Sequence, residues 1–101
     1  METLRSHRDE LAASGVASLS LFGSVARGDD SEGSDVDIVV KLRDDAKQGL
    51  AYFGTMETLG IRLSVILDRH VDLVTEPVKK QALRRSIERD RVVALEDPII
   101  F

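Results

Sequence analysis

Short apolar runs alternate with amphipathic stretches along this chain of 101 residues. The stretch 16–22 alternates apolar with small polar side chains, and 36–40 is rich in β-branched residues, so both predict strands. Across 52–67 the apolar side chains recur at steps of three and four, which predicts a long helix. The same reasoning predicts helices at 2–14 and 77–90, a turn or two of helix at 24–27, and further strands at 71–75 and 92–95.

Glycine and proline set some of the expected bounds. Gly15 suits the end of the first helix, and Pro77 suits the first turn of the last helix because its fixed φ is already helical. Gly54 and Gly60 interrupt the long helix and predict a kink or close packing there. Strands interleaved with helices predict one α/β (α+β) domain over 1–101, in which helices flank a small mixed sheet of about four strands.

The composition is that of an ordinary globular domain. Hydrophobic residues make up 43% of the chain and charged residues 32%, enough apolar surface for one core at this length. A formal net charge of −4 argues against sequence-independent binding to nucleic acid, which depends on many lysines and arginines. The absence of cysteine excludes disulfides and thiolate metal sites. No apolar stretch resembles a signal peptide or a membrane span, so we expect a cytoplasmic protein without membrane contact.

Candidate chemistry is concentrated in the sequence LFGSVARGDDSEGSDVDIVV at 21–40. Gly23 and Gly28 have the spacing of a phosphate-binding P-loop, but two aspartates follow where that loop needs Lys and then Ser or Thr, so a P-loop is excluded. An EF-hand loop is excluded as well, since Gly33 at its turn position would put a glycine at the first ligand position. What remains is a Gly-Ser pair at a strand end and, ten residues later, an Asp-x-Asp that opens the next strand.

Asp35 and Asp37 point to the same side of the second strand, with α-carbons about 6–7 Å apart. Two carboxylates so placed can share a divalent cation, and without one their like charges disfavour joint ionisation. Mg²⁺ is the expected ion, because it takes a few carboxylates and completes its octahedron with water and substrate phosphate. Asp72 is the best candidate for a third ligand, since it stands alone in an otherwise apolar strand; its alternative is an edge residue or ion-pair partner.

Gly23 and Ser24 supply the complementary half of a phosphate site. A glycine lets the backbone approach a phosphate, and the amides and hydroxyl that open the short helix can receive the anion, although Ser24 could also serve as an N-cap. Arg27, one helical turn on, either steers phosphate or pairs with the surrounding structure. The two histidines, His7 and His70, are expected at the surface or at the boundary of the core, because two isolated imidazoles without nearby ligand partners make a poor zinc site.

The complete motif resembles a known family. Phe22-Gly23-Ser24-x-Ala26-Arg27-Gly28, then Ser34-Asp35-x-Asp37, and later Val71-Asp72-Leu73-Val74 are similar to the minimal nucleotidyltransferases (MNT), within the superfamily that includes DNA polymerase β. The likeness covers most of the chain, and the combined motif is far more specific than any one of its pieces. The resemblance implies the nucleotidyltransferase fold and a two-metal mechanism with ATP as the substrate. The residues that it assigns are the catalytic metal ligands Asp35, Asp37 and Asp72, which would hold two Mg²⁺ ions, and the ATP-binding residues Gly23, Ser24 and Arg27.

The resemblance also implies a biological role. In this family, chains as short as this one are antitoxins paired with HEPN ribonuclease toxins, and they transfer AMP from ATP to a tyrosine of the toxin. Two alternatives stay open. A non-catalytic antitoxin that occludes its partner is disfavoured by the three clustered acids, and a small-molecule nucleotidyltransferase is disfavoured because so short a chain offers little surface to enclose its acceptor.

Overall fold

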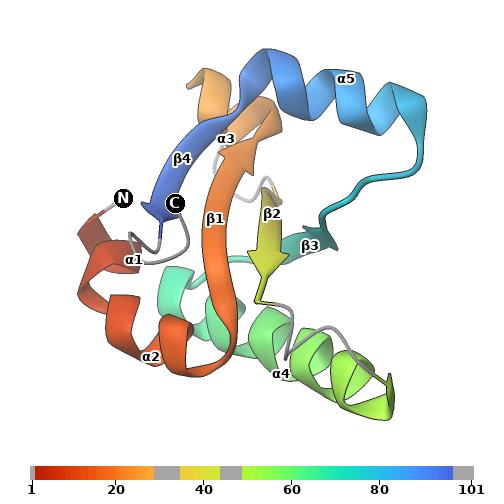
Figure 1. Ribbon diagram of the computed structural model, residues 1–101. Helices are drawn as coiled ribbons and strands as arrows, with labels where there is room; N and C mark the ends of the chain where they lie inside the picture. The colour runs from red at the N-terminus through yellow and green to blue at the C-terminus, as the bar shows by residue number, and fades with distance from the viewer. Residues whose placement is uncertain (1, 29–34, 44–48, 97–101) are drawn as a thin grey trace.

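The computed structural model describes residues 2–28, 35–43 and 49–96. Its elements follow the alternation that the sequence predicts (Figure 1). They are α1 (Glu2–Ser6), α2 (Arg8–Ala13), β1 (Val16–Phe22), α3 (Gly23–Arg27), β2 (Val36–Leu42), α4 (Gly49–Leu67), β3 (Val71–Thr75), α5 (Gln81–Asp90) and β4 (Val92–Glu96).

The strands form one mixed sheet in the order β3-β2-β1-β4. β1 pairs antiparallel with β2 on one side and with β4 on the other, whereas β2 and β3 run parallel. A parallel pair needs a long crossover connection, and α4 lies within it. The sheet and its flanking helices confirm the predicted fold class. The parallel pairing also sets the first residues of β2 and β3 side by side.

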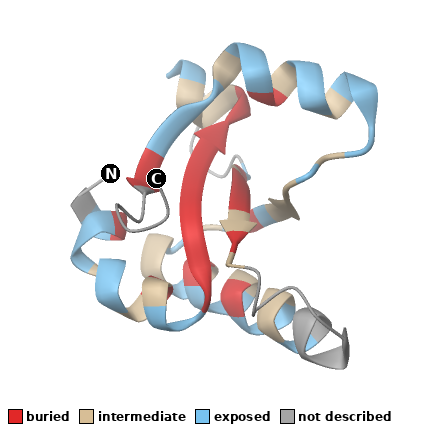
Figure 2. Cartoon of the chain, in the orientation of Figure 1, coloured by how far each residue is buried: buried red, intermediate tan, exposed pale blue. Residues whose placement is uncertain are grey.

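Side chains of the sheet alternate between two cores on its opposite faces. Ile38 and Val40 of β2 lie in a large cluster with residues of α1, α2 and α4. Val39 lies in a second cluster, with Phe22 of β1 and Ile87 of α5. β1 is buried along its whole length and forms the centre of the molecule (Figure 2). Positions of β2 that share the side of Val39 therefore face the layer that contains α5.

The first predicted helix is divided into two. The break falls at His7, whose backbone (φ −105°, ψ 16°) departs from helical geometry, so α1 and α2 replace the continuous helix expected at 2–14. Gly15 has a φ of +100° and follows α2, which agrees with its predicted place at the helix end. The two short helices can then pack at different angles over the same face of the sheet.

The predicted start of the last helix, at Pro77, was wrong. α5 begins at Gln81, four residues after Pro77, and Lys80 still has an extended backbone (φ −71°, ψ 120°). The physical reason lies in Val78, which packs against the cluster of β1, β2 and α5 before the helix begins. Burial of this side chain outweighs the local preference of proline for a first helical turn.

The long helix is continuous. α4 runs unbroken through both of its internal glycines. Among the residues that the structure describes, a Cβ atom at Gly54 would meet nothing within 4 Å, and one at Gly60 would lie 3.9 Å from Leu73, an ordinary contact. Within the described part of the chain, the close packing predicted at these two glycines is therefore not found. Neither α4 nor any other helix in the described ranges has the length and apolarity to span a membrane.

Candidate active site

Three carboxylates meet where β2 and β3 begin. Asp35 directly precedes β2, and Asp37 of β2 is the register partner of Asp72 in β3. Because side chains alternate along a strand, Asp37 shares the face of Val39 and Asp72 shares the face of Val74, and both valines contact the α5 cluster. The structure thus brings together the three acids that the sequence singled out.

Burial and like charge raise the pKa of Asp37. Burial is the largest cause, the charges of Asp72 and Asp35 follow, and Arg27 opposes them. Asp37 is half-buried, while the other two acids are exposed. A group of acids that repel one another gains stability from a bound cation, and their oxygen atoms are the ligands that Mg²⁺ prefers. The residues present therefore fit the metal that the sequence predicts.

His70 joins this group, which the sequence interpretation did not foresee. Its Nδ1 atom lies 3.2 Å from Oδ1 of Asp35. One ligand atom from each of Asp35, His70 and Asp72 lies within 4.8 Å of the others. The side chain is at the surface as expected, but its contact with Asp35 was not predicted. The missing signal was the parallel pairing of Val36 with Val71, which aligns the residues directly before each strand.

Gly23 is required by the position of Asp37. Phe22, the last residue of β1, is the register partner of Asp37, so the chain turns into α3 directly beside this carboxylate. Gly23 has a φ of +71°, and a Cβ atom there would lie 2.3 Å from Oδ2 of Asp37. Real Cβ atoms do not approach an oxygen so closely, and L side chains avoid this φ. The absence of a side chain at Gly23 therefore leaves the space that the half-buried carboxylate of Asp37 occupies.

Ser24 lies inside α3 and does not cap it. The N-cap position belongs to Phe22, which makes no side-chain capping hydrogen bond. Ser24 is therefore in the first helical turn, where backbone amides have no partner within the helix. This placement removes the alternative in which Ser24 serves as the N-cap. Its predicted contact with phosphate, like that of Gly23, stays a prediction.

Arg27 makes the structural contact that was one of its two expected roles. Its Nη1 atom donates a hydrogen bond of 2.7 Å to Oδ2 of Asp90, the last residue of α5, whose side chain is only 5% exposed. Arg89 and Arg27 both hold the pKa of Asp90 below its usual value. The ion pair ties α3 to α5, and the guanidinium is close enough to the acids to act on Asp37. Its predicted contact with ATP stays a prediction.

Asp37→Asn should stabilise the metal-free protein at neutral pH. Because the folded pKa of Asp37 is raised, the parent loses stability as the pH rises from the ordinary value of 3.8 through the folded pKa, and the loss is complete above it. The asparagine variant has no titrating group at this position, so its stability shows no such loss. In excess chelator, the variant's Tm should therefore exceed the parent's at pH 7, and the difference should shrink as the pH falls through the folded pKa toward 3.8. A difference that is absent at pH 7, or that grows in acid, would contradict this account.

Comparison with known proteins decides the family. Residues 4–94 match the family model described as "Nucleotidyltransferase domain". The chain belongs to this family. The match confirms the resemblance drawn from the motif, and together with the curated relatives it confirms that this enzyme is a nucleotidyltransferase.

Individual relatives support this family assignment. A Methanocaldococcus jannaschii protein described as "Putative protein adenylyltransferase MJ0126" is 34% identical over 93 residues, which covers 90% of each chain. A solved "Structure of putative minimal nucleotidyltransferase" has a TM-score of 0.67 at 30% identity, over 90% of this nucleotidyltransferase and 92% of that chain. A chain from a "tri-AMPylated Shewanella oneidensis HEPN toxin in complex with MNT antitoxin" has a TM-score of 0.58 at 18% identity, over 95% of this chain and 75% of its own. The last likeness shows a shared fold.

Proposed function

We propose that this nucleotidyltransferase is a Mg²⁺-dependent protein adenylyltransferase and an antitoxin, and that it transfers AMP from ATP to a tyrosine hydroxyl of a partner HEPN toxin. The observation that carries the proposal is the pairing of Asp37 with Asp72 across β2 and β3, with Asp35 beside them. Catalysis of nucleotidyl transfer by two metal ions requires such a group of carboxylates. An antitoxin that acted by occlusion alone would have no physical need for it.

Each residue of the site has a defined part in this proposal. Asp35 and Asp37 would hold the ion that carries the β- and γ-phosphates. With Asp72 they would also share the second ion, which meets the acceptor hydroxyl. When bound, Mg²⁺ neutralises phosphate charge and lowers the pKa of that hydroxyl. The amides of the first turn of α3 and the hydroxyl of Ser24 would receive the phosphates. The new bond joins the acceptor oxygen to the α-phosphorus, the bond to pyrophosphate breaks, and the hydroxyl proton passes to solvent.

The relatives support the acceptor and the partner. The curated relative named above carries the description of a protein adenylyltransferase, and the solved Shewanella oneidensis complex pairs an AMPylated HEPN toxin with an MNT antitoxin. The acids Asp35 and Asp72 are exposed, so the site is open on one side. A folded protein acceptor would cover that side and exclude water, which a small acceptor could not do.

Labelled ATP tests the reaction. The purified chain is incubated with Mg²⁺, a HEPN partner and ATP labelled at either the α- or the γ-phosphate. We expect the α-label on the partner and no γ-label, because AMP transfer retains only the α-phosphate. Label from the γ-position would indicate phosphorylation instead. No label from either position would contradict the proposed transfer.

Binding of ATP should depend on a divalent cation. The three acids have the same sign as the triphosphate, so without a cation they repel it. We expect the Kd for ATP, measured by calorimetry, to be at least about tenfold higher in excess chelator than with Mg²⁺. Asp37→Asn, which removes one negative charge, should show a smaller difference between the two conditions. Equal affinity of the parent in both would contradict the metal's role in binding.

A further inference from the structure

His70 and Asp35 occupy equivalent places at the start of two parallel strands. Asp35 directly precedes β2, His70 directly precedes β3, and Val36 pairs with Val71. Side chains two residues apart on a strand share a face, so His70 lies on the side of Asp72, as Asp35 lies on the side of Asp37. Both side chains are accessible, with exposed fractions of 70% for His70 and 49% for Asp35. The imidazole thus faces the same opening as the carboxylates.

The distances within this group are close to those between ligands on one ion. Nδ1 of His70 and Oδ1 of Asp35 are 3.2 Å apart. Two neighbouring ligands on an octahedral ion with bonds of about 2.1–2.2 Å are separated by about 3.0–3.1 Å. An oxygen of Asp72 completes the group within 4.8 Å, close to the span of about 4.3 Å between opposite ligands on such an ion. Small rotations of exposed side chains would therefore close the three atoms around a cation.

We propose that His70 is a nitrogen ligand of the catalytic metal and that it shifts the site's preference from Mg²⁺ toward Mn²⁺. This inference rests on the proposed function, because it concerns the metal that the acids would hold. Magnesium is a hard ion that favours oxygen donors, whereas imidazole nitrogen favours first-row transition metals. A site built from carboxylates alone would gain nothing from a transition metal's affinity for nitrogen. A site that includes His70 would bind a transition metal more tightly through the imidazole nitrogen.

The competing role for His70 is an ion pair with Asp35 alone. In that case the imidazole nitrogen would stay off the metal and would only orient the carboxylate. The distance of 3.2 Å suits both roles. The position of Asp72 favours ligation, because its oxygen lies within 4.8 Å of both of the other atoms, an arrangement that an ion pair between two residues does not need.

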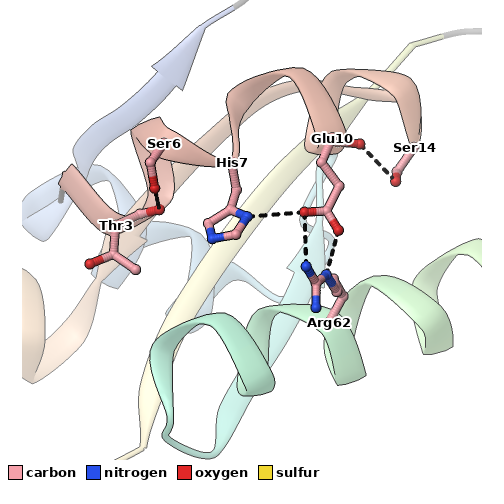
Figure 3. Close-up of polar contacts among 6 residues, drawn as sticks. All are labelled: Thr3, Ser6, His7, Glu10, Ser14 and Arg62. Atoms are coloured by element: carbon pink, nitrogen blue, oxygen red, sulfur yellow. Dashed lines mark hydrogen bonds and ion pairs between the residues drawn. The ribbon is translucent and has the colours of Figure 1, made fainter.

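His7 provides a matched control. Its Nδ1 atom lies 3.1 Å from Oε2 of Glu10, which also pairs with Arg62 of α4 (Figure 3). This histidine–carboxylate contact has nearly the same length as that of His70 with Asp35. It lies at the junction of α1 and α2, which precede β1, whereas Gly23 and the acids lie beyond the other end of β1. The chain contains only these two histidines, so any imidazole bound to the metal belongs to one of them.

Metal binding tests the proposal without any catalytic readout. Mn²⁺ is titrated into the parent, His70→Gln and His7→Gln, free Mn²⁺ is counted by electron paramagnetic resonance, and nitrogen coupling is detected by electron spin echo modulation. Mg²⁺ affinity follows from competition. We expect nitrogen coupling in the parent and in His7→Gln, and its loss in His70→Gln together with about a tenfold loss of Mn²⁺ affinity. The affinity for Mg²⁺ should fall by a smaller factor.

Two results would overturn the role of His70. One is a parent without nitrogen coupling, and the other is a His70→Gln variant that keeps the parent's Mn²⁺ affinity. Because His70 is exposed and glutamine keeps a polar side chain there, the variant should fold, and its circular dichroism and Tm check this. Failure of this inference is separable from failure of the proposed function. A chain that binds Mn²⁺ through nitrogen but transfers no AMP contradicts only the function, and an active chain without nitrogen coupling contradicts only the ligand.

Discussion

Asp72→Asn should abolish AMP transfer while the protein stays folded and still binds ATP. Asparagine keeps the shape of the side chain and removes the charge that would hold the ion at the acceptor hydroxyl. Asp35 and Asp37 remain to bind the nucleotide with its metal. We expect the rate of transfer to fall by about a hundredfold or more, the scale of losing one charge-stabilising group in an active site, while the Kd for ATP changes far less.

Stability and a matched variant separate this effect from damage to the fold. Asp72 is exposed and lies among like charges, so its replacement should leave the Tm of the metal-free protein unchanged or raise it. Asp68→Asn is the control. It removes an exposed carboxylate from the turn that precedes β3, and asparagine also tolerates the φ of +53° found there. Transfer by Asp68→Asn should equal the parent's. An active Asp72→Asn would mean that Asp72 does not hold a catalytic metal.

Gly23→Ala should impair ATP binding and transfer more severely than an alanine substitution at any other described glycine. The new Cβ would lie 2.3 Å from Oδ2 of Asp37, so the carboxylate, the strand end or the start of α3 must move. Asp37 is the half-buried member of the acid group, and its displacement separates it from Asp72. We expect Mg²⁺-dependent ATP binding to weaken by at least about tenfold and transfer to become undetectable. Calorimetry and the labelled-ATP assay measure the two effects.

Gly28→Ala separates the effect of a steric clash with Asp37 from the effect of an unfavourable backbone conformation. Gly28 also has a positive φ, +78°, but a Cβ atom there would meet no atom of a described residue within 4 Å. Its replacement should cost about 1–2 kcal/mol of stability, the penalty of a left-handed conformation, and leave ATP binding intact. Gly54→Ala, within α4 and clear of the other described residues, should stabilise the protein by about 0.5–1 kcal/mol. Equal losses of ATP binding in the Gly23 and Gly28 variants would contradict the packing of Gly23 against Asp37.

Local signals in the sequence were enough to predict the strands and to single out three acids that the structure brings together. The strands around 16–22 and 36–40 follow from residue type and alternation, which depend on neighbours in the chain. Asp35 and Asp37 follow from their spacing of two, and Asp72 follows from its contrast with an apolar strand. Their meeting was implied by the family resemblance, and the structure supplies the register that produces it.

Features that depend on distant contacts could not be predicted in the same way. His70 was missed because its partner lies 35 positions earlier in the chain, and only the parallel register of β2 and β3 reveals the contact. The start of α5 was misplaced because the partly buried Val78 packs against residues of β1 and β2, contacts that local preferences do not contain. Gly23 was singled out as a phosphate-binding candidate, but its approach to Asp37 appears only when β1 and β2 are paired.

The intact mass of the partner toxin tests the central claim most directly. The HEPN partner is incubated with ATP, Mg²⁺ and either the parent chain or Asp72→Asn, and its toxicity is followed in cells that express the same pairs. The account predicts a gain of about 329 Da per transferred AMP with the parent only, and loss of protection with the variant. If the toxin gains no mass with either chain while both protect the cells equally, the protein neutralises its partner by occlusion and the transfer mechanism is wrong.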